Sequence, residues 1–345
     1  MKKTMFKYFA IAAIASIAMC GCDGDKPVLH VYNWAEYIDP DYIDKFEKDN
    51  NCKVEVDVFD SNETAFAKLM GGATGYDIMF PSSYFIEPFK NAGLIEKLDM
   101  SKLPNVAKNF DKRFDEHDGN ALVWHVPYAF SLVGILYRKD KTTKPEKWDD
   151  MFQPKNAGRI CIMNDIREVI GIALRTIGES ANTTNKDAIA KAIEVARRWK
   201  SKASKMDSES YRTGLPAGEF YVAMSYLSDA LQLVVEHPST IGFVIPEEGV
   251  ISSLDVFTIL KSSKNKDLAY KFIDGLYDPK TAAKNDEAIC APCSVLGVEE
   301  YLSEEYKNVP GAVVTDEMFK HCEPILDIGD GLEIFSEAWD KIKAN

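Results

Sequence analysis

Trp34 and Tyr37 contribute two aromatic rings, and Glu36 a carboxylate, directly after a strand-like run at residues 28–33. In an open α/β sheet, ligands bind at the carboxyl ends of the strands. Ring faces attract an organic cation, and a carboxylate neutralises its charge. The segment therefore indicates a site for an organic cation, with packing of the same rings in the hydrophobic core as the alternative.

Side chains of the same kinds follow other segments that have the pattern of strands. Loops that met at one cleft would form a negative slot with aromatic walls, suited to a linear ligand with ammonium ends and an apolar middle. Arg167 is the one cation among these loops. The set comprises Ser82 and Tyr84 after residues 76–80, Asp165 and Glu168 after residues 159–163, Tyr226 and Asp229 at the end of residues 220–226, and Asp255 at the start of residues 254–260.

The carboxylates of Asp165 and Glu168 also have a structural interpretation. Asp-x-x-Glu at a helix start matches a capping box, in which both side chains accept hydrogen bonds from backbone N–H groups. The helix dipole favours acids at this position, and capping and ligand binding can coexist. Asp229 has the same two interpretations. Glu36 lies too early to cap the helix that Pro40 begins, so a ligand contact explains it better.

Cys290 and Cys293 have the spacing of a redox or metal-binding pair. No second pair of Cys or His stands at ligand spacing, although His321 and Cys322 could in principle join them. We therefore expect no metal and no cofactor, but a disulfide or buried thiols. An odd number of cysteines lies beyond the N-terminal segment, so at least one thiol stays unpaired. They are Cys52, Cys161, Cys290, Cys293 and Cys322.

The first residues indicate export. Three lysines precede an apolar run at residues 9–19, which is too short to span a bilayer and has the layout of a secretory signal. Cys22, after small Gly21, resembles the end of a bacterial lipobox. We expect a lipoprotein signal peptide at residues 1–21 and lipid on Cys22, with Cys20 as the alternative residue and an ordinary cleaved signal as the alternative interpretation. The lipid would hold a soluble domain at a membrane face, which we expect to be the inner membrane.

The composition fits a globular protein and argues against a nucleic-acid-binding protein. Of the 345 residues, 46% are hydrophobic and 28% charged, as in globular proteins. The formal net charge of −13 argues against nucleic acid and favours cationic ligands, with plain solubility as the simpler explanation. The chain contains no GxSxG, P-loop or HExxH motif, so we expect no catalysis.

Strand and helix patterns alternate, which predicts an α/β fold of two lobes, each a mainly parallel sheet flanked by helices. We expect lobe 1 at residues 22–131 plus 257–315 and lobe 2 at residues 132–256 plus 316–345, with the ligand cleft between them. Residues 121–137, which contain Pro127, have the pattern of two extended segments that cross between the lobes. Strands are expected at residues 28–33, 53–59, 76–80, 159–163, 220–226, 241–246 and 254–260, and helices at residues 40–50, 63–70, 165–178, 185–202, 267–277 and 331–343, with one more starting near residue 228.

Four motifs in the same order resemble the periplasmic spermidine/putrescine-binding proteins of polyamine ABC importers, and the similarity covers nearly the whole mature chain. The resemblance implies a type II solute-binding protein of the periplasm, with a polyamine between its lobes and with the permease and ATPase subunits of the importer as partners. The motifs are Tyr-Asn-Trp-Ala-Glu-Tyr, Asp-Ser-Asn-Glu-Thr, Tyr-Asp-Ile-Met-Phe-Pro-Ser-Ser-Tyr and Asp-Ile-Arg-Glu-Val.

Carried over position by position, the resemblance also implies the residues of the ligand site. Asp229 is similar to a ligand carboxylate of the putrescine-selective branch. The others are Trp34, Glu36, Tyr37, Ser82, Tyr84, Asp165, Glu168, Ser208, Tyr226 and Asp255.

The chain departs from the family pattern at five positions. Ser253 and Cys290 stand where rings are usual, Tyr226 replaces a tryptophan, Ile325 a polar contact and Ala35 a hydroxyl residue. Each lost cation–π contact is worth on the order of 1 kcal/mol, so a several-fold change in affinity or in chain-length preference is expected. Another cationic metabolite or small solute in the same fold is the alternative ligand.

Overall fold

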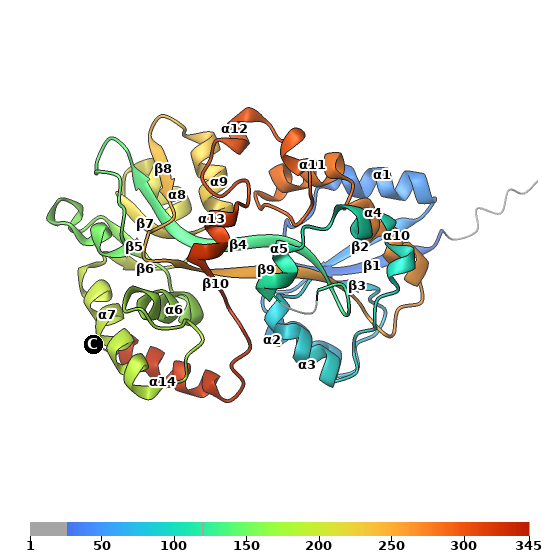
Figure 1. Cartoon of the computed structure of the whole chain (residues 1–345), viewed down its shortest axis with the longest axis horizontal. Helices are drawn as coiled ribbons and strands as arrows, with labels where there is room; N and C mark the ends of the chain where they lie inside the picture. The colour runs from blue at the N-terminus through green and yellow to red at the C-terminus, as the bar shows by residue number, and fades with distance from the viewer. Residues whose placement is uncertain (1–25, 119–120, 345) are drawn as a thin grey trace, which may run out of the picture.

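The computed structural model describes residues 26–118 and 121–344 (Figure 1). The predicted signal peptide and the candidate lipidation residues Cys20 and Cys22 lie outside these ranges. Within them, none of the helices is both long and apolar enough to cross a membrane.

The first three strands form one half of the sheet. β1 (Val28–Asn33) pairs in parallel with β2 (Lys53–Val58) and with β3 (Ile78–Met79), as the alternating pattern predicts. The connecting helices are α1 (Pro40–Asn50) and α2 (Asn62–Met70), and α3 (Ile86–Asn91) follows β3. Asp39 and Ser61 cap α1 and α2 by accepting hydrogen bonds from backbone N–H groups in the first turn. These caps fix where the loops after β1 and β2 end.

The other half of the sheet also has a parallel core. β5 (Ile160–Ile162) pairs in parallel with β6 (Lys205–Met206) and with β7 (Val222–Tyr226). β7 and β8 (Ile241–Val244) flank the strand that precedes β5, one on each side, and both are antiparallel to it. The helices of this half are α6 (Ile166–Thr176), α7 (Lys186–Lys202), α8 (Tyr211–Ala217) and α9 (Leu227–Glu236).

Two long antiparallel strands, β4 (Val126–Arg138) and β9 (Val250–Ile259), join the halves (Figure 1). β9 pairs with β3 on one side and with β4 on the other, and β4 in turn pairs with β7. The described strands therefore form one sheet. Residues 121–137 were expected to form two extended segments, which is wrong: from Val126 the chain is one strand, β4, whose register shifts between Pro127 and Ala129. β9 begins at Val250, so Asp255 lies within the strand and not at its start.

The C-terminal third returns to both halves. β10 (Cys322–Pro324) pairs in parallel with the beginning of β9, and α14 (Gly331–Lys343) packs on α6 and α7. The predicted helix at residues 267–277 is α10 (Lys266–Gly275). The sequence analysis missed α8 and most of the other short helices, because few turns give a weak periodicity. These are α4 (Pro104–Asn109), α5 (Arg113–Asp118), α12 (Glu304–Lys307) and α13 (Asp316–His321). The longer α11 (Pro279–Ile289) was also missed, because its buried side is mostly alanine and polar residues.

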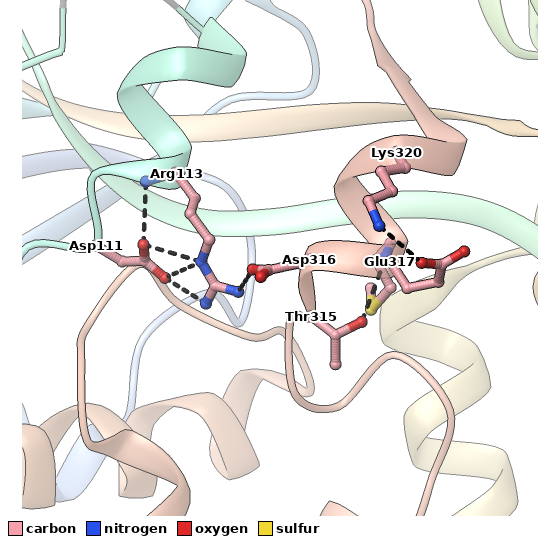
Figure 2. A network of polar contacts seen from close by, with 7 residues as sticks. Asp111, Arg113, Thr315, Asp316, Glu317 and Lys320 are labelled. Atoms are coloured by element: carbon pink, nitrogen blue, oxygen red, sulfur yellow. Dashed lines mark hydrogen bonds and ion pairs between the residues drawn. The ribbon is translucent and has the colours of Figure 1, made fainter.

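A polar network holds α13 against the start of α5 (Figure 2). The carboxylate of Asp111 accepts hydrogen bonds from Nε and Nη2 of Arg113, and Nη1 of Arg113 donates to Asp316 at 2.7 Å. The guanidinium also lies 5.5 Å from the ring centroid of Phe319. The chain therefore enters β10 directly from a helix, α13, whose position is held by this network.

Candidate ligand-binding cleft

A cleft of about 800 Å³ lies between the two halves of the sheet and is lined from both. Its volume is within the range of about 300–1,000 Å³ that is typical of small-ligand pockets. Residues far apart in the sequence meet here because the β1 and β3 ends face the β5 and β7 ends. The predicted residues that line it are Trp34, Tyr37, Ser82, Tyr84, Asp165, Glu168, Tyr226 and Asp255.

Asp255 presents a carboxylate whose two oxygens are both occupied by hydroxyl donors. Ser82 Oγ donates to Oδ1 and the Tyr37 hydroxyl donates to Oδ2, each at 2.8 Å. Asn62 in turn fixes Ser82, since its amide donates to Ser82 Oγ and accepts from Ser82 N. Burial raises the pKa of Asp255 to about 6, against the opposite effect of the two hydroxyls. This wall is a preoriented acceptor for a cation.

Asp165 and Glu168 form the opposite wall at the start of α6. Asp165 is the N-cap, and its Oδ1 accepts a hydrogen bond from Glu168 N at 3.1 Å, so the predicted capping role is confirmed for Asp165. Glu168 is only 8% exposed, and its Oε2 has no hydrogen-bond partner in the described chain. Burial, together with the nearby Asp165, raises the pKa of Glu168 well above its ordinary value. An ammonium group would supply the missing donor.

Aromatic side chains line the cleft between these carboxylates. The Tyr226 hydroxyl lies 3.4 Å from Asp165 Oδ2, and the Tyr84 hydroxyl accepts from Asn62 Nδ2 at 3.3 Å. Burial raises the pKa of Tyr84 to about 12 and that of Tyr226 further, so both are neutral phenols at physiological pH. Trp34 Nε1 is buried without a partner among the described residues. Rings and unpaired donors or acceptors thus face one space.

Several residues of the cleft escaped the sequence analysis. The stretch Asp60–Glu63 belongs to one of the four family motifs but was not assigned to the site, and the pattern of α14 predicts only a helix. Arg167 lines the cleft, but its guanidinium donates to Leu326 O and to Asn182 Oδ1, which ties it to neighbouring loops. The additional lining residues are Asp60, Ser61, Asn62, Glu63, Ser131, Asn164, Ile166, Arg167, Ser228, Leu332, Ser336 and Trp339, and Ser253 and Ile325, singled out above as departures, also line it.

Three predicted residues lie outside this cleft, and for them a ligand contact stays a prediction. Glu36 is exposed, with a left-handed φ of 53°, and lines a second cavity together with Asp229. Asp229 accepts a hydrogen bond from Tyr211 and pairs with Arg212 at 3.2 Å. Ser208 Oγ accepts from Asn164 N at 3.0 Å, so it orders the loop before α6.

All five cysteines of the described chain are free, so the disulfide alternative is wrong. Burial raises the pKa of Cys161 to about 11 and that of Cys322 to about 12, and it also raises the pKa of Cys290 and Cys293. Buried neutral thiols are poor nucleophiles and poor metal ligands. Among the described residues, no three His, Cys, Asp or Glu side chains are grouped to hold a metal ion.

Comparisons with known proteins agree with this architecture. The family model described as "Bacterial extracellular solute-binding protein" matches residues 73–310. The putrescine-binding periplasmic protein SpuD of Pseudomonas aeruginosa and the spermidine/putrescine-binding periplasmic protein of Escherichia coli are each 30% identical, over 100% of this chain and 99% of theirs.

Solved structures show the same two-lobed α/β arrangement. A putative spermidine/putrescine ABC transporter from Listeria monocytogenes is 30% identical with a TM-score of 0.80, over 92% of this chain and 98% of its own. The Tp0655 (TpPotD) lipoprotein of Treponema pallidum is 30% identical with a TM-score of 0.82, over 91% and 99%. The predicted fold and the resemblance inferred from the four motifs are therefore confirmed. The chain belongs to the bacterial extracellular solute-binding proteins.

Proposed function

We propose that the protein is an extracytoplasmic receptor that binds putrescine, spermidine or both and delivers them to an ABC importer. The observation that carries the proposal is the pair of carboxyl groups on opposite walls, Asp255 with its oriented oxygens and Glu168 with its unpartnered Oε2. A linear diamine has an ammonium at each end and methylenes between, which match carboxylates at the walls and rings between them. Relatives named for these two polyamines support the same assignment.

Ligand capture would proceed by closure of the two lobes and without catalysis. A ligand that contacts both walls favours the closed form by its differential affinity for that form. The elements that must bend are β4 and β9, which run between the halves, and the register shift at Pro127 lies in one of them. The predicted lobe boundaries, between residues 131 and 132 and between residues 256 and 257, lie in these two strands. Asp255 bonds to Tyr37 and Ser82 of lobe 1, so we place the second boundary before Asp255.

A lipid anchor on Cys22, or on Cys20, would keep the receptor at the inner membrane beside the permease and ATPase subunits. One structural relative is named a lipoprotein, and others are named as ABC transporters. Incorporation of radiolabelled palmitate into the full-length protein tests the anchor. Cys22→Ser should abolish labelling while Cys20→Ser retains it, and labelling that survives both substitutions would refute the anchor.

Titration calorimetry of the mature protein tests the main proposal. Putrescine or spermidine should give a saturable heat at micromolar ligand, and Glu168→Gln should weaken it. No heat with either ligand would overturn the proposal.

Ser253, which lines the cleft in place of a usual ring, favours a second candidate, another cationic metabolite or small solute. A panel of such compounds competing against labelled putrescine separates the two.

A further inference from the structure

The loop after β1, residues 34–39, brings Trp34 and Tyr37 to the cleft. Between them, Glu36 has a left-handed φ of 53°, which residues other than glycine seldom adopt without support from their surroundings. The Tyr37 hydroxyl can donate to Asp255 only while this loop is held in place. The contacts that hold the loop therefore determine the geometry of this wall of the site.

Three buried side chains hold the backbone of the loop. Tyr128 Oη donates to Tyr37 O at 2.8 Å, and Asn33 Nδ2 donates to the same carbonyl oxygen at 3.1 Å. Asn285, in α11, accepts a hydrogen bond at Oδ1 from Asp39 N at 3.1 Å. All three side chains are buried, so water does not compete for these bonds. The loop is thus tied at Tyr37 and at its last residue.

The hydrogen bonds of Asn285 determine which way the Tyr128 hydroxyl points. Because Asn285 Oδ1 accepts from a backbone N–H, its Nδ2 faces Tyr128 Oη, to which it donates at 3.0 Å. The hydroxyl oxygen is an acceptor toward Asn285, so its own proton is directed to Tyr37 O. The rings of Tyr128 and Tyr37 also meet edge to face, with their centroids 5.5 Å apart. Tyr128 therefore holds Tyr37 by its carbonyl and by its ring.

We infer that Tyr128 and Asn285 are positioning residues of the ligand site, which place the Tyr37 hydroxyl on Asp255. Neither is among the described residues that line the cleft or the cavity beside it, so their effect on a ligand passes through Tyr37. That hydroxyl donates to Asp255 Oδ2 at 2.8 Å. This positioning role rests on the proposed function, because it concerns the wall that receives the ammonium group.

The pH dependence of ligand binding reports where the Tyr37 hydroxyl lies. Burial raises the pKa of Asp255 to about 6, and the hydrogen bonds from Ser82 and Tyr37 oppose this rise. A displaced hydroxyl would raise the pKa further, so binding would begin to weaken at a higher pH on acidification. Three phenols, Tyr37, Tyr84 and Tyr128, interact with the charge of Asp255, and burial raises the pKa of each, so none changes charge in this range. A residue that only stabilised the fold would not move this pH dependence.

The test is calorimetry with putrescine, from about pH 5 to about pH 8, on Tyr128→Phe, which removes the hydroxyl and keeps the ring. Affinity at neutral pH should fall about threefold, less than in Tyr37→Phe, because Asn33 still donates to the carbonyl. The pH at which binding weakens should rise by about half a unit. Tyr277→Phe is the matched control, since it removes another buried hydroxyl, which donates to Pro127 O at 2.6 Å. The control should lower the melting temperature and leave the affinity and its pH dependence unchanged.

Two further variants identify the route of the effect. Tyr37→Phe combined with Tyr128→Phe should bind no more weakly than Tyr37→Phe alone, because both substitutions act through one hydroxyl. Asn285→Ala keeps Tyr128 and removes the donor that orients its hydroxyl, so it should raise the pH at which binding weakens by a smaller amount. This variant also decides the question if Tyr128→Phe does not fold.

The outcomes separate the positioning role from the proposed function. No heat from putrescine with the unmodified protein would refute the proposed function. If the unmodified protein binds putrescine, but Tyr128→Phe and Asn285→Ala keep its affinity and pH dependence as the control does, the positioning role is refuted. Losses that add fully in the double variant also contradict it, because Tyr128 would then act by a route other than the Tyr37 hydroxyl.

Discussion

Asp255 and Glu168 are both buried carboxyl groups of one cleft, yet their surroundings differ in kind. Asp255 has a hydroxyl donor on each oxygen, whereas Glu168 keeps an oxygen without a partner in the described chain. A buried acceptor left unpaired costs about 1–3 kcal/mol, which a bound donor would recover. The carboxyl group of Asp255 thus has its hydrogen-bond donors before the ligand arrives, whereas that of Glu168 gains its missing donor from the ligand.

The difference follows from how each wall is built. Asp255 is surrounded by three segments, β9 itself, the loop after β1 and the loop after β3, and two of these supply hydroxyls. Glu168 stands in the first turn of α6, whose backbone N–H groups are served by the cap Asp165. We therefore expect mutations at Glu168 to act mainly on binding, and mutations around Asp255 to act on binding and stability together.

Among these substitutions, replacing Glu168 by Gln should lower ligand affinity the most. The loss of a charge-assisted hydrogen bond in a desolvated site is worth about 2–3 kcal/mol, so putrescine affinity should fall on the order of a hundredfold. Titration calorimetry measures it. The melting temperature should stay constant or rise, because a neutral amide replaces a carboxyl group that lacks a partner. A clear fall in melting temperature without a loss of affinity would show that Glu168 is structural.

The pH dependence of binding sharpens the same comparison. Because the pKa of Asp255 is raised to about 6 without ligand, the acid is neutral at lower pH and a cation must displace its proton. Affinity should fall by up to about tenfold per pH unit below about pH 6 for each proton released. Calorimetry in two buffers of different ionisation enthalpy counts those protons. Binding without proton release near pH 6 would contradict the expectation.

The stability of the ligand-free protein should show the opposite trend. The native state holds a proton on Asp255 that the unfolded state has already released, so this group lowers the unfolding free energy as pH rises from about 4 to about 6. Denaturant titrations at several pH values give the unfolding free energy of the ligand-free protein and of Asp255→Asn. The difference between the two pH trends is the contribution of Asp255. A pH trend that is identical in the two proteins would exclude it.

Removing the hydroxyl donors should have a moderate effect. Tyr37→Phe and Ser82→Ala each delete one bond to Asp255, worth about 1 kcal/mol, so affinity should fall about fivefold. Tyr37→Phe keeps the ring contact with Tyr128 and isolates the hydroxyl. Calorimetry of the two variants, and of their combination, shows whether the losses add. No loss in either variant would mean that the ligand does not use Asp255.

The smallest effects are expected where a predicted residue lies outside the cleft. Ser208→Ala and Asp229→Asn should change putrescine affinity by less than about twofold, because Ser208 bonds to a backbone N–H and Asp229 is paired with Arg212. Calorimetry measures the affinity of these two variants, and the loss found for Glu168→Gln serves as the reference for a large effect. A loss above tenfold in either variant would show that closure brings these residues to the ligand.

The site was predictable where its chemistry coincides with a strand end. Trp34, Tyr84 and Asp165 follow strands whose patterns are clear, so both the side chain and its place could be inferred. Asp229 has the same local pattern, but its partners Tyr211 and Arg212 come from a helix that the sequence did not reveal. A position at a strand end therefore predicts roughly where a side chain lies, but it does not predict which residues that side chain contacts.

Long-range packing was the part that could not be predicted. Trp339 reaches the cleft because α14 packs on α6 and α7, whereas its helical pattern indicates only that one face is buried. β4 remains one strand although Pro127 lies near its start, because the register shifts beside it. In β9, Ser252 and Ser253 hide the apolar pattern, so its first residues and the position of Asp255 were misjudged.

The position of Asp255 within β9 has a consequence for inhibition. Asp255 is hydrogen-bonded to Ser82 and Tyr37, which lie on the loops after β3 and β1 in one half of the sheet. A ligand that touches only these three residues therefore makes the same contacts whether the lobes are open or closed. Such a contact adds affinity and contributes nothing to the closed state. Short monoamines that reach this wall alone should therefore occupy the receptor without closing it, and block uptake without being transported.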